Sequence, residues 1–221
     1  MWSTAIPCRK ENTKMFSKFL NLPKEKQERI LNAAIKEFAQ NGFVKASTNE
    51  IIKNAGISKG LLFHYFKNKK TLYLFLYDYC LDLCMKEFYN KINMDEPDIF
   101  AKLRECLFIK AELIMKYPEF FLFIEVAYIE TQNEVKTDLQ LINESFIISM
   151  YAKLFHNIDT SKFKEGLDIE KCINIIIWTI DGFGAAAMKK DKSLVSNKKS
   201  YEKAFAEAGV YIDVLKNSFY K

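Results

Sequence analysis

Two short helix signals separated by one glycine occupy residues 47–66, and they restrict the folds open to this chain. Ser47 and Glu50, in the sequence STNE, match a capping box at the start of a helix. Gly56 suits the left-handed backbone of a tight turn, and Ser58 is suited to cap the helix that follows it. The pattern predicts helix, turn, helix, in which the second helix can enter the major groove of DNA.

A longer amphipathic helix is predicted just before this pair. Pro23 is favoured at a helix start and Gly42 at a helix stop. The apolar residues between them recur at helical spacing: Ile30, Leu31, Ala34, Ile35, Phe38 and Ala39. Residues 23–70 therefore read as a compact three-helix domain.

The rest of the chain is predicted to be helical too. Only 7 glycines and 4 prolines leave little material for a fold rich in tight turns. Further helices are predicted over residues 68–92, 99–116, 119–130, 134–156, 169–189 and 199–219. We expect an all-α fold with an N-terminal extension or arm over 1–22, a helix-turn-helix DNA-binding domain over 23–70, and a further helical domain over 71–221.

Charge is divided unevenly along the chain. Residues 1–70 hold 14 lysines and arginines against 5 acidic residues, whereas residues 71–221 hold 19 against 23. A solvated basic face would explain the first excess, and so would a polyanionic partner such as double-stranded DNA.

One side of the second helix of the pair carries the groups that could meet DNA. Lys59 and, further on, Lys69 supply cations, while Gly60 lets the backbone approach closely. Ser58 and the amides of the helix start can hold a phosphate. His64 and Tyr65 offer hydrogen bonds to bases or phosphates, and Leu61 and Phe63 could touch thymine methyl groups.

The stretch EFAQNGFVKASTNEIIKNAGISKGLLFHYFKNKKTLY resembles the DNA-binding segment of the tetracycline-repressor (TetR) family of bacterial transcriptional regulators. The resemblance covers residues 23–73 and includes Phe before the Asn-Gly turn, Thr-x-x-Ile, Ala-Gly-Ile-Ser-Lys-Gly and the closing Phe-Lys-x-Lys. It implies DNA contacts from Thr48, Ser58, Lys59, Gly60, His64, Tyr65 and Lys69. In one departure, Phe63 stands where the family often has a tyrosine whose hydroxyl binds phosphate.

The same resemblance implies that residues 71–221 form a helical ligand-binding and dimerisation domain, with a small-molecule pocket and a dimer interface. For the interface we expect small and apolar residues of the last two helices: Gly182, Ala186, Phe205, Tyr211 and Ile212. For an apolar effector we expect Phe121, Glu125, Tyr128, Phe146 and Trp178. Packing within one chain is the alternative for both sets, and for the aromatic residues it is the more frequent one.

Other classes of protein are disfavoured. The chain has no HExxH and no phosphate-binding glycine loop, its two histidines lack metal-ligand spacing, and we expect no metal and no cofactor. Five scattered cysteines, no signal-peptide pattern and no long uninterrupted apolar run favour a cytoplasmic protein without a membrane segment. Met15 could be the native start, with residues 1–14 an upstream extension; alternatively they form a basic arm.

The sequence thus predicts a regulator, most often a repressor in this family, that binds a near-palindromic operator as a homodimer and responds to a hydrophobic small molecule. A helix-turn-helix protein without small-molecule input is the first alternative. A helical enzyme is the second and weaker one.

Overall fold

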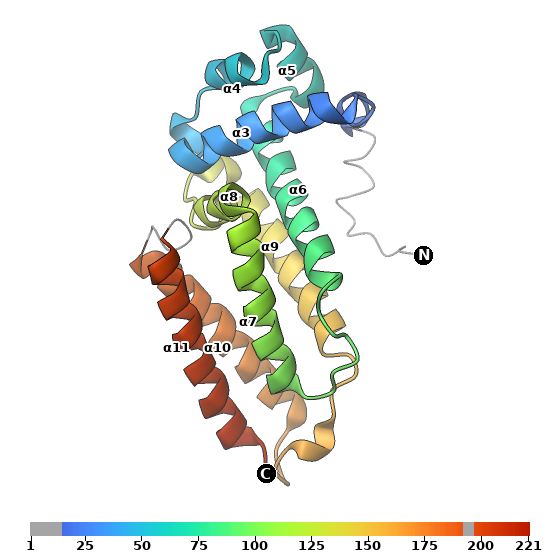
Figure 1. Cartoon of the computed structure of the whole chain (residues 1–221), viewed down its shortest axis with the longest axis vertical. Helices are drawn as coiled ribbons and strands as arrows, with labels where there is room; N and C mark the ends of the chain where they lie inside the picture. The colour runs from blue at the N-terminus through green and yellow to red at the C-terminus, as the bar shows by residue number, and fades with distance from the viewer. Residues whose placement is uncertain (1–14, 192–196) are drawn as a thin grey trace. The chain divides into compact units, whose positions relative to one another are not determined.

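The computed structural model describes residues 15–191 and 197–221 (Figure 1). Within these ranges the chain is built of helices, and the pairing of Phe163 with Tyr220 is an isolated antiparallel bridge rather than part of a sheet. The predicted all-α fold is confirmed. The predictions about residues 1–14, an arm or an upstream extension, lie outside the described residues.

Contacts divide the chain into two compact units. The first contains residues up to Leu81 together with Leu122–Ser145, and the second contains Asp82–Phe121 and Phe146–Lys221. The expected boundary after residue 70 differs from this division, because part of the predicted C-terminal domain groups with the N-terminal helices.

The first unit begins with α2 (Ser17–Leu20), α3 (Lys24–Lys45), α4 (Thr48–Ala55) and α5 (Lys59–Phe66). It continues into α6 (Lys69–Tyr89), and it also contains most of α8 (Pro118–Tyr128) and the start of α9 (Asn133–Leu154). In Figure 1, α4 and α5 lie along one side of α3. The short helix α2 had no counterpart in the sequence-based expectation.

Aromatic rings fill the core of the first unit. Phe38 of α3 lies 4.8 Å from Tyr73 of α6, and Tyr73 lies 5.2 Å from Phe123 of α8, both edge to face. Phe38, Tyr73 and Phe123 are all fully buried. Burial of rings of this size, in the geometry that aromatic pairs prefer, is a major source of stability.

The second unit combines the end of α6 and the second part of α9 with α7 (Ile99–Lys116), α10 (Ile169–Lys190) and α11 (Lys198–Phe219). One of its apolar clusters joins α7, α10 and α11 through Phe100, Ile176 and Ile212. Lys102 of α7 is fully buried, and its ammonium donates to Met94 O (3.1 Å), Leu154 O (2.8 Å) and Asn157 Oδ1 (3.1 Å). Three acceptors satisfy the three donors of this cation.

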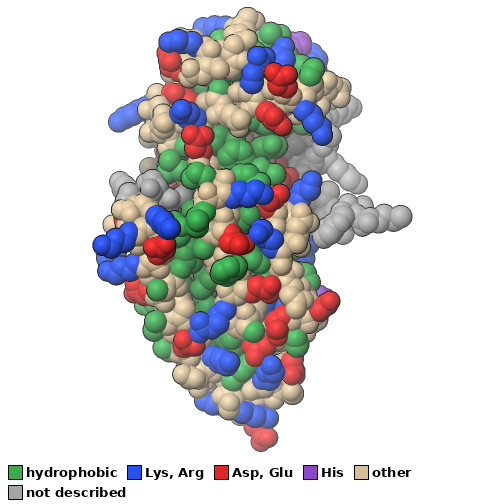
Figure 2. Space-filling view, viewed as in Figure 1, with side chains coloured by type: hydrophobic (Ala, Val, Ile, Leu, Met, Phe, Trp, Pro, Cys, Tyr) green, Lys and Arg blue, Asp and Glu red, His purple; other side chains and the backbone are tan. Residues whose placement is uncertain are grey.

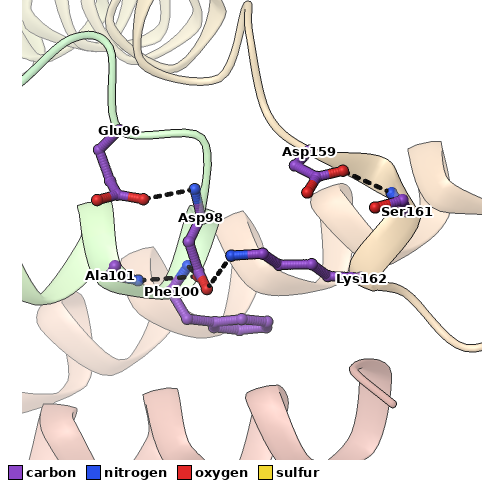
Figure 3. A network of polar contacts seen from close by, with 7 residues as sticks. All are labelled: Glu96, Asp98, Phe100, Ala101, Asp159, Ser161 and Lys162. Atoms are coloured by element: carbon purple, nitrogen blue, oxygen red, sulfur yellow. Dashed lines mark hydrogen bonds and ion pairs between the residues drawn. The ribbon is translucent and has the colours of Figure 1, made fainter.

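A polar network fixes the start of α7 in the same unit (Figure 3). Asp98 caps the helix by accepting from Phe100 N at 2.9 Å and Ala101 N at 3.1 Å, and Lys162 donates to its other oxygen at 3.0 Å. Partial burial by itself would raise the pKa of Asp98, but the hydrogen bonds from Lys162 and the two amides outweigh it and lower the pKa.

One helix of the described ranges, α10, is long and apolar enough to cross a membrane by length and composition alone. Only 11% of its apolar window is buried within the structure. We had expected no such segment from the sequence. The observation is weak support for a membrane span, because helices of soluble proteins pass the same test.

Candidate nucleic-acid interface

Both helices of the helix-turn-helix pair begin with the predicted N-caps, and α4 ends at the predicted glycine. The Ser47 side chain accepts from Glu50 N at 3.4 Å at the start of α4, and Ser58 accepts from Leu61 N at 3.4 Å at the start of α5. Gly56 ends α4 with φ 61° and ψ 43°, the left-handed conformation in which a side chain would be strained. These three residues set the turn between α4 and α5.

Glu37 of α3 fixes the start of α4 from outside the pair. Its Oε1 accepts from Ser47 N at 2.8 Å and from Asn41 Nδ2 at 3.0 Å. The capping box predicted that Glu50 would take the Ser47 amide, but a carboxylate from the neighbouring helix takes it instead.

Most of the predicted DNA-contacting residues lie on the surface of the first unit. Ser58, Lys59, Gly60 and His64 are exposed, and Thr48 is half-buried at the first position of α4. A side chain at Gly60 would meet no atom within 4 Å, so the backbone there faces open space. In Figure 2, lysine and arginine side chains lie at the end of the chain that carries α4 and α5, with acidic side chains among them. This surface offers cations, an accessible helix start and an imidazole to a polyanion.

Tyr65 does not share that surface. Only 7% of it is exposed, and its ring lies 6.1 Å from Phe19 and 6.4 Å from Phe66. Tyr65 follows the buried Leu62 by three residues and shares its face of α5, so its side chain points toward the interior of the unit rather than to the surface where DNA contact was expected.

Lys69 is engaged within the protein. Its Nζ donates to Val44 O at 3.0 Å and lies 5.3 Å above the centre of the Phe43 ring. Burial lowers the pKa of Lys69, while the charges of Glu134 and Glu37 act in the opposite direction. The ammonium group has three N–H donors, so a phosphate contact remains available to it.

Phe16 and Phe19 are structural residues of this unit that the sequence reasoning missed. They are 3% and 1% exposed, and their rings pack on Phe66 of α5 and Phe75 of α6. Two aromatic residues three apart just before Pro23 were the available signal. The sequence analysis assigns this segment to the N-terminal extension because it precedes the family pattern.

The predicted effector residues are divided between the two units. Phe121, Phe146 and Trp178 belong to the second unit, and Glu125 and Tyr128 belong to the first. Trp178 is 69% exposed, so it does not line the interior of its unit. Glu125 is buried and Phe121 packs beside an apolar cluster that includes Phe88 and Leu113.

The predicted dimer residues are mostly accessible. Gly182 and Ala186 are exposed on α10, Tyr211 is 40% exposed on α11, and Phe205 is half-buried beside Tyr201. Ile212 is fully buried, because it is the next residue along α11 and points into the core. Ile212 therefore cannot contact a second copy through this surface.

An exposed apolar surface extends beyond the predicted dimer residues. On α10, Ile175 (42%) and Trp178 (69%) share a helical face with Gly182 and Ala186. On α11, Val210 and Val214 are 60% and 57% exposed. Figure 2 shows hydrophobic side chains at the surface along α11 and the adjacent side of α7. We call Ile175, Trp178, Val210, Tyr211 and Val214 the α10–α11 apolar face.

Among residues 15–191 and 197–221, no group of three or more His, Cys, Asp or Glu side chains could hold a metal ion. Burial raises the pKa of the Cys84 and Cys106 thiols to about 12, which keeps them protonated at neutral pH. At such a pKa neither thiol is an activated nucleophile.

Comparisons with known proteins agree with this surface. A family profile described as bacterial regulatory proteins, tetR family, matches residues 30–75, which include α4 and α5. The uncharacterized HTH-type transcriptional regulator YerO of Bacillus subtilis (strain 168) is 27% identical over 150 residues, 65% of this chain and 49% of YerO. The chain thus spans about half the length of that relative.

Two further proteins match over more of their length. The HTH-type transcriptional regulator QacR of Staphylococcus aureus (strain Mu50 / ATCC 700699) is 32% identical over 153 residues, 67% of this chain and 74% of QacR. The crystal structure of the transcriptional regulator FadR from Bacillus subtilis in complex with stearoyl-CoA superposes with a TM-score of 0.66 at 20% identity. It covers 85% of this chain and 96% of FadR, which shows a shared fold.

These regulators are not enzymes, and their names agree with a surface built to bind DNA. Identity of 32% with coverage of 74% of QacR, together with a profile match on the helix-turn-helix, shows that the chain belongs to the TetR family of bacterial transcriptional regulators.

Proposed function

We propose that this chain is a ligand-responsive transcriptional repressor that binds a near-palindromic DNA operator as a homodimer. The observation that carries the proposal is α5, a capped helix that follows a left-handed glycine turn and exposes Lys59, Gly60 and His64 together. In our proposal α5 enters the major groove, where Lys59 and the start of α5 bind phosphate and His64 reads a base edge. Thr48, Ser58 and Lys69 supply further contacts to the DNA backbone, and Tyr65 supports α5 from its buried side.

The α10–α11 apolar face supports dimerisation. Five apolar side chains that are 40–69% exposed on two neighbouring helices are costly to leave in water. A twofold axis through this face would pair the same surface of two copies, with Gly182 and Ala186 allowing close approach of the helices. Coverage by a second copy also accounts for the low burial of α10 within one chain. We place the protein in the cytoplasm, where its operator lies.

Response to a small molecule is supported by the fold that this chain shares with FadR. FadR was crystallised with stearoyl-CoA, which favours a hydrophobic effector for a protein of the same fold. Phe121 and Phe146 are the candidates in the second unit, and Glu125 and Tyr128 in the first. A ligand that prefers the state unable to bind DNA would release the operator in proportion to that preference.

The test is selection of bound sequences from a pool of random duplexes by the purified full chain at two salt concentrations. Enrichment of an inverted repeat supports a dimeric, sequence-specific regulator and supplies the probe for an effector screen with acyl-CoA molecules. Binding of single half-sites only would overturn the dimer. Specific binding without release by any tested ligand would favour the alternative, a DNA-binding protein without small-molecule input.

A further inference from the structure

The turn that precedes α3 is packed into the DNA-binding unit through two phenylalanines. The Phe19 ring lies 4.8 Å from Phe66 and 6.1 Å, edge to face, from Tyr65, both on the inner side of α5. It also lies 5.5 Å from Phe75 of α6. Phe16 is 5.9 Å from Phe66 and 4.5 Å from Phe75. The two rings thus fill the space between α5, the recognition helix of the proposed function, and α6.

A second set of contacts holds this segment from the side of α3. Gln27 Nε2 donates to Leu20 O at 2.9 Å and to Leu22 O at 2.8 Å. These two carbonyls flank the end of α2, so one side chain in the first turn of α3 fixes the path of the chain between the two helices. Phe19 is therefore held in place by the backbone around it.

The recognition helix is short enough to depend on such support. α5 has 8 residues, and isolated helices shorter than about 12–15 residues are marginal in water. Its inner residues Leu62, Tyr65 and Phe66 are 1%, 7% and 0% exposed, and Phe19 contacts two of these three. Packing of these rings determines how α5 is rotated about its axis.

The same packing reaches the outward side of α5. The Tyr65 ring lies 5.8 Å from the ring of exposed His64. A change at Phe19 that lets Tyr65 and Phe66 move inward would rotate α5 and displace His64 from its position on the surface.

We propose that Phe19, supported by Phe16 and Gln27, is a positioning residue for DNA recognition that orients α5 from its inner side. The proposal rests on the proposed DNA-binding function. It assigns residues 16–22 to the DNA-binding part of the first unit rather than to a dispensable extension. Phe19 itself does not touch DNA in this account, because it is 1% exposed.

The test compares full-length Phe19→Ala with the wild type on the selected operator and on a scrambled duplex. We expect the preference for the operator over the scrambled duplex to fall about tenfold, as for loss of a base contact, with a change of less than about threefold on the scrambled duplex. Phe19→Leu, which keeps most of the apolar volume, should recover most of the preference.

Phe38→Ala is the matched control. Phe38 is also a fully buried phenylalanine of the first unit, but its ring pairs are with Tyr73 and Phe123 rather than with α5. It should lower stability without changing the operator preference of the folded protein. If Phe19→Ala does not fold, Gln27→Met tests the same idea, because it removes both donors from a partly exposed side chain.

Hydrogen exchange of the amides of residues 59–66 in the free protein separates this inference from the proposed function. In Phe19→Ala or Gln27→Met we expect the α5 amides to exchange faster than in the wild type, while the α10 amides are unchanged. This result is expected even if the wild type selects no operator. Failure of the wild type to select an operator would remove only the proposed function. The inference would be overturned if the α5 amides of Phe19→Ala exchange as in the wild type, or if Phe19→Ala keeps the operator preference of the wild type. It would also be overturned if Phe38→Ala loses as much operator preference as Phe19→Ala.

Discussion

The carboxylate of Glu37 accepts a hydrogen bond from the backbone amide of Ser47, with 2.8 Å between Oε1 and the nitrogen. Glu37 lies on α3, and Ser47 is the N-cap of α4. The amide at a helix N-cap usually finds its partner within its own helix, in the side chain three residues later. Here a separate helix supplies the acceptor, so α4 is tied in position relative to α3.

Loss of the Glu37 carboxylate should therefore lower the free energy of unfolding more than loss of Glu50, the glutamate of the capping box. Glu37→Ala is expected to lower the free energy of unfolding by about 1–3 kcal/mol, because it leaves the Ser47 amide without its charged partner. Glu50→Ala should cost less than about 0.5 kcal/mol. Urea unfolding of both variants measures the difference, and equal losses would contradict the role assigned to Glu37.

Two lysines near the DNA surface should respond differently to substitution. Lys59→Ala is expected to reduce the slope of log affinity against log salt by about one unit without a change in stability, since the side chain is exposed and neutralises one phosphate in the proposed complex. Lys69→Ala should also lower stability, because the ammonium group loses its bond to Val44 O. DNA titrations at several salt concentrations, paired with thermal unfolding, distinguish the two. An unchanged slope for Lys59→Ala would remove its phosphate contact.

Phe63→Tyr restores the hydroxyl that the family often has at this position. Phe63 is half-buried on α5. If α5 approaches DNA as proposed, the new hydroxyl should gain one phosphate contact and raise operator affinity about three- to tenfold, as expected for a single hydrogen bond to a charged group. Titration with the selected operator checks this. No gain in affinity would mean that the helix approaches the groove differently.

The stability of the second unit should depend on pH through Asp181. Its Oδ1 accepts from the Tyr151 hydroxyl at 2.8 Å. Burial raises the pKa of Asp181 above its usual value, although the bond from Tyr151 and the charge of Lys110 oppose this. Because the pKa is higher in the folded state, the protonated carboxyl stabilises the fold. This stability is lost as pH rises through the pKa of the folded state.

Asp181→Asn should consequently be more stable than the wild type at pH 7, with a gain that shrinks as pH falls toward 4. The amide keeps an acceptor for Tyr151 and carries no charge to desolvate. Denaturant unfolding at a series of pH values between 4 and 8 measures the gain. At the upper end we expect about 1.4 kcal/mol for each unit by which the pKa of Asp181 in the folded state exceeds that in the unfolded state. A gain independent of pH would show that the charge is not its cause.

The oligomeric state should depend on the α10–α11 apolar face. Ile175→Glu places a carboxylate in that face, and a twofold axis would bring two such charges into one interface. We expect light scattering to report the 25.9 kDa chain mass for this variant and twice that mass for the wild type. Leu141→Glu on α9 is the control and should remain dimeric, because Leu141 is an even more exposed apolar position (62% against 42% for Ile175) outside that face. A dimeric Ile175→Glu would place the interface elsewhere.

Local sequence signals predicted the helices well. Ser47, Gly56 and Ser58 act within a few residues of themselves, so their caps and turn could be predicted without tertiary information. The Asn68 cap of α6 was predicted on the same grounds, and Thr71 N donates to its side chain at 2.8 Å. Predicted helices such as 99–116 agree with α7 as observed.

Features that depend on distant residues could not be predicted. The partner of the Ser47 amide comes from Glu37, and the Lys69 ammonium group binds Val44 O, 25 residues earlier in the chain. Phe19 meets Tyr65 only after the chain has folded back on α3. The outward or inward direction of Tyr65 and Ile212 depended on the rotation of each helix in its unit, which helical spacing alone left undetermined.

The division of the chain into two units bears on how such a protein can change during evolution. The chain passes from one unit to the other within α6, within α8 and within α9. A single genetic crossover that exchanged everything after the helix-turn-helix would therefore replace residues 122–145 of the first unit as well. New effector specificities in this lineage are expected to arise by point substitution rather than by exchange of an intact sensing module between relatives.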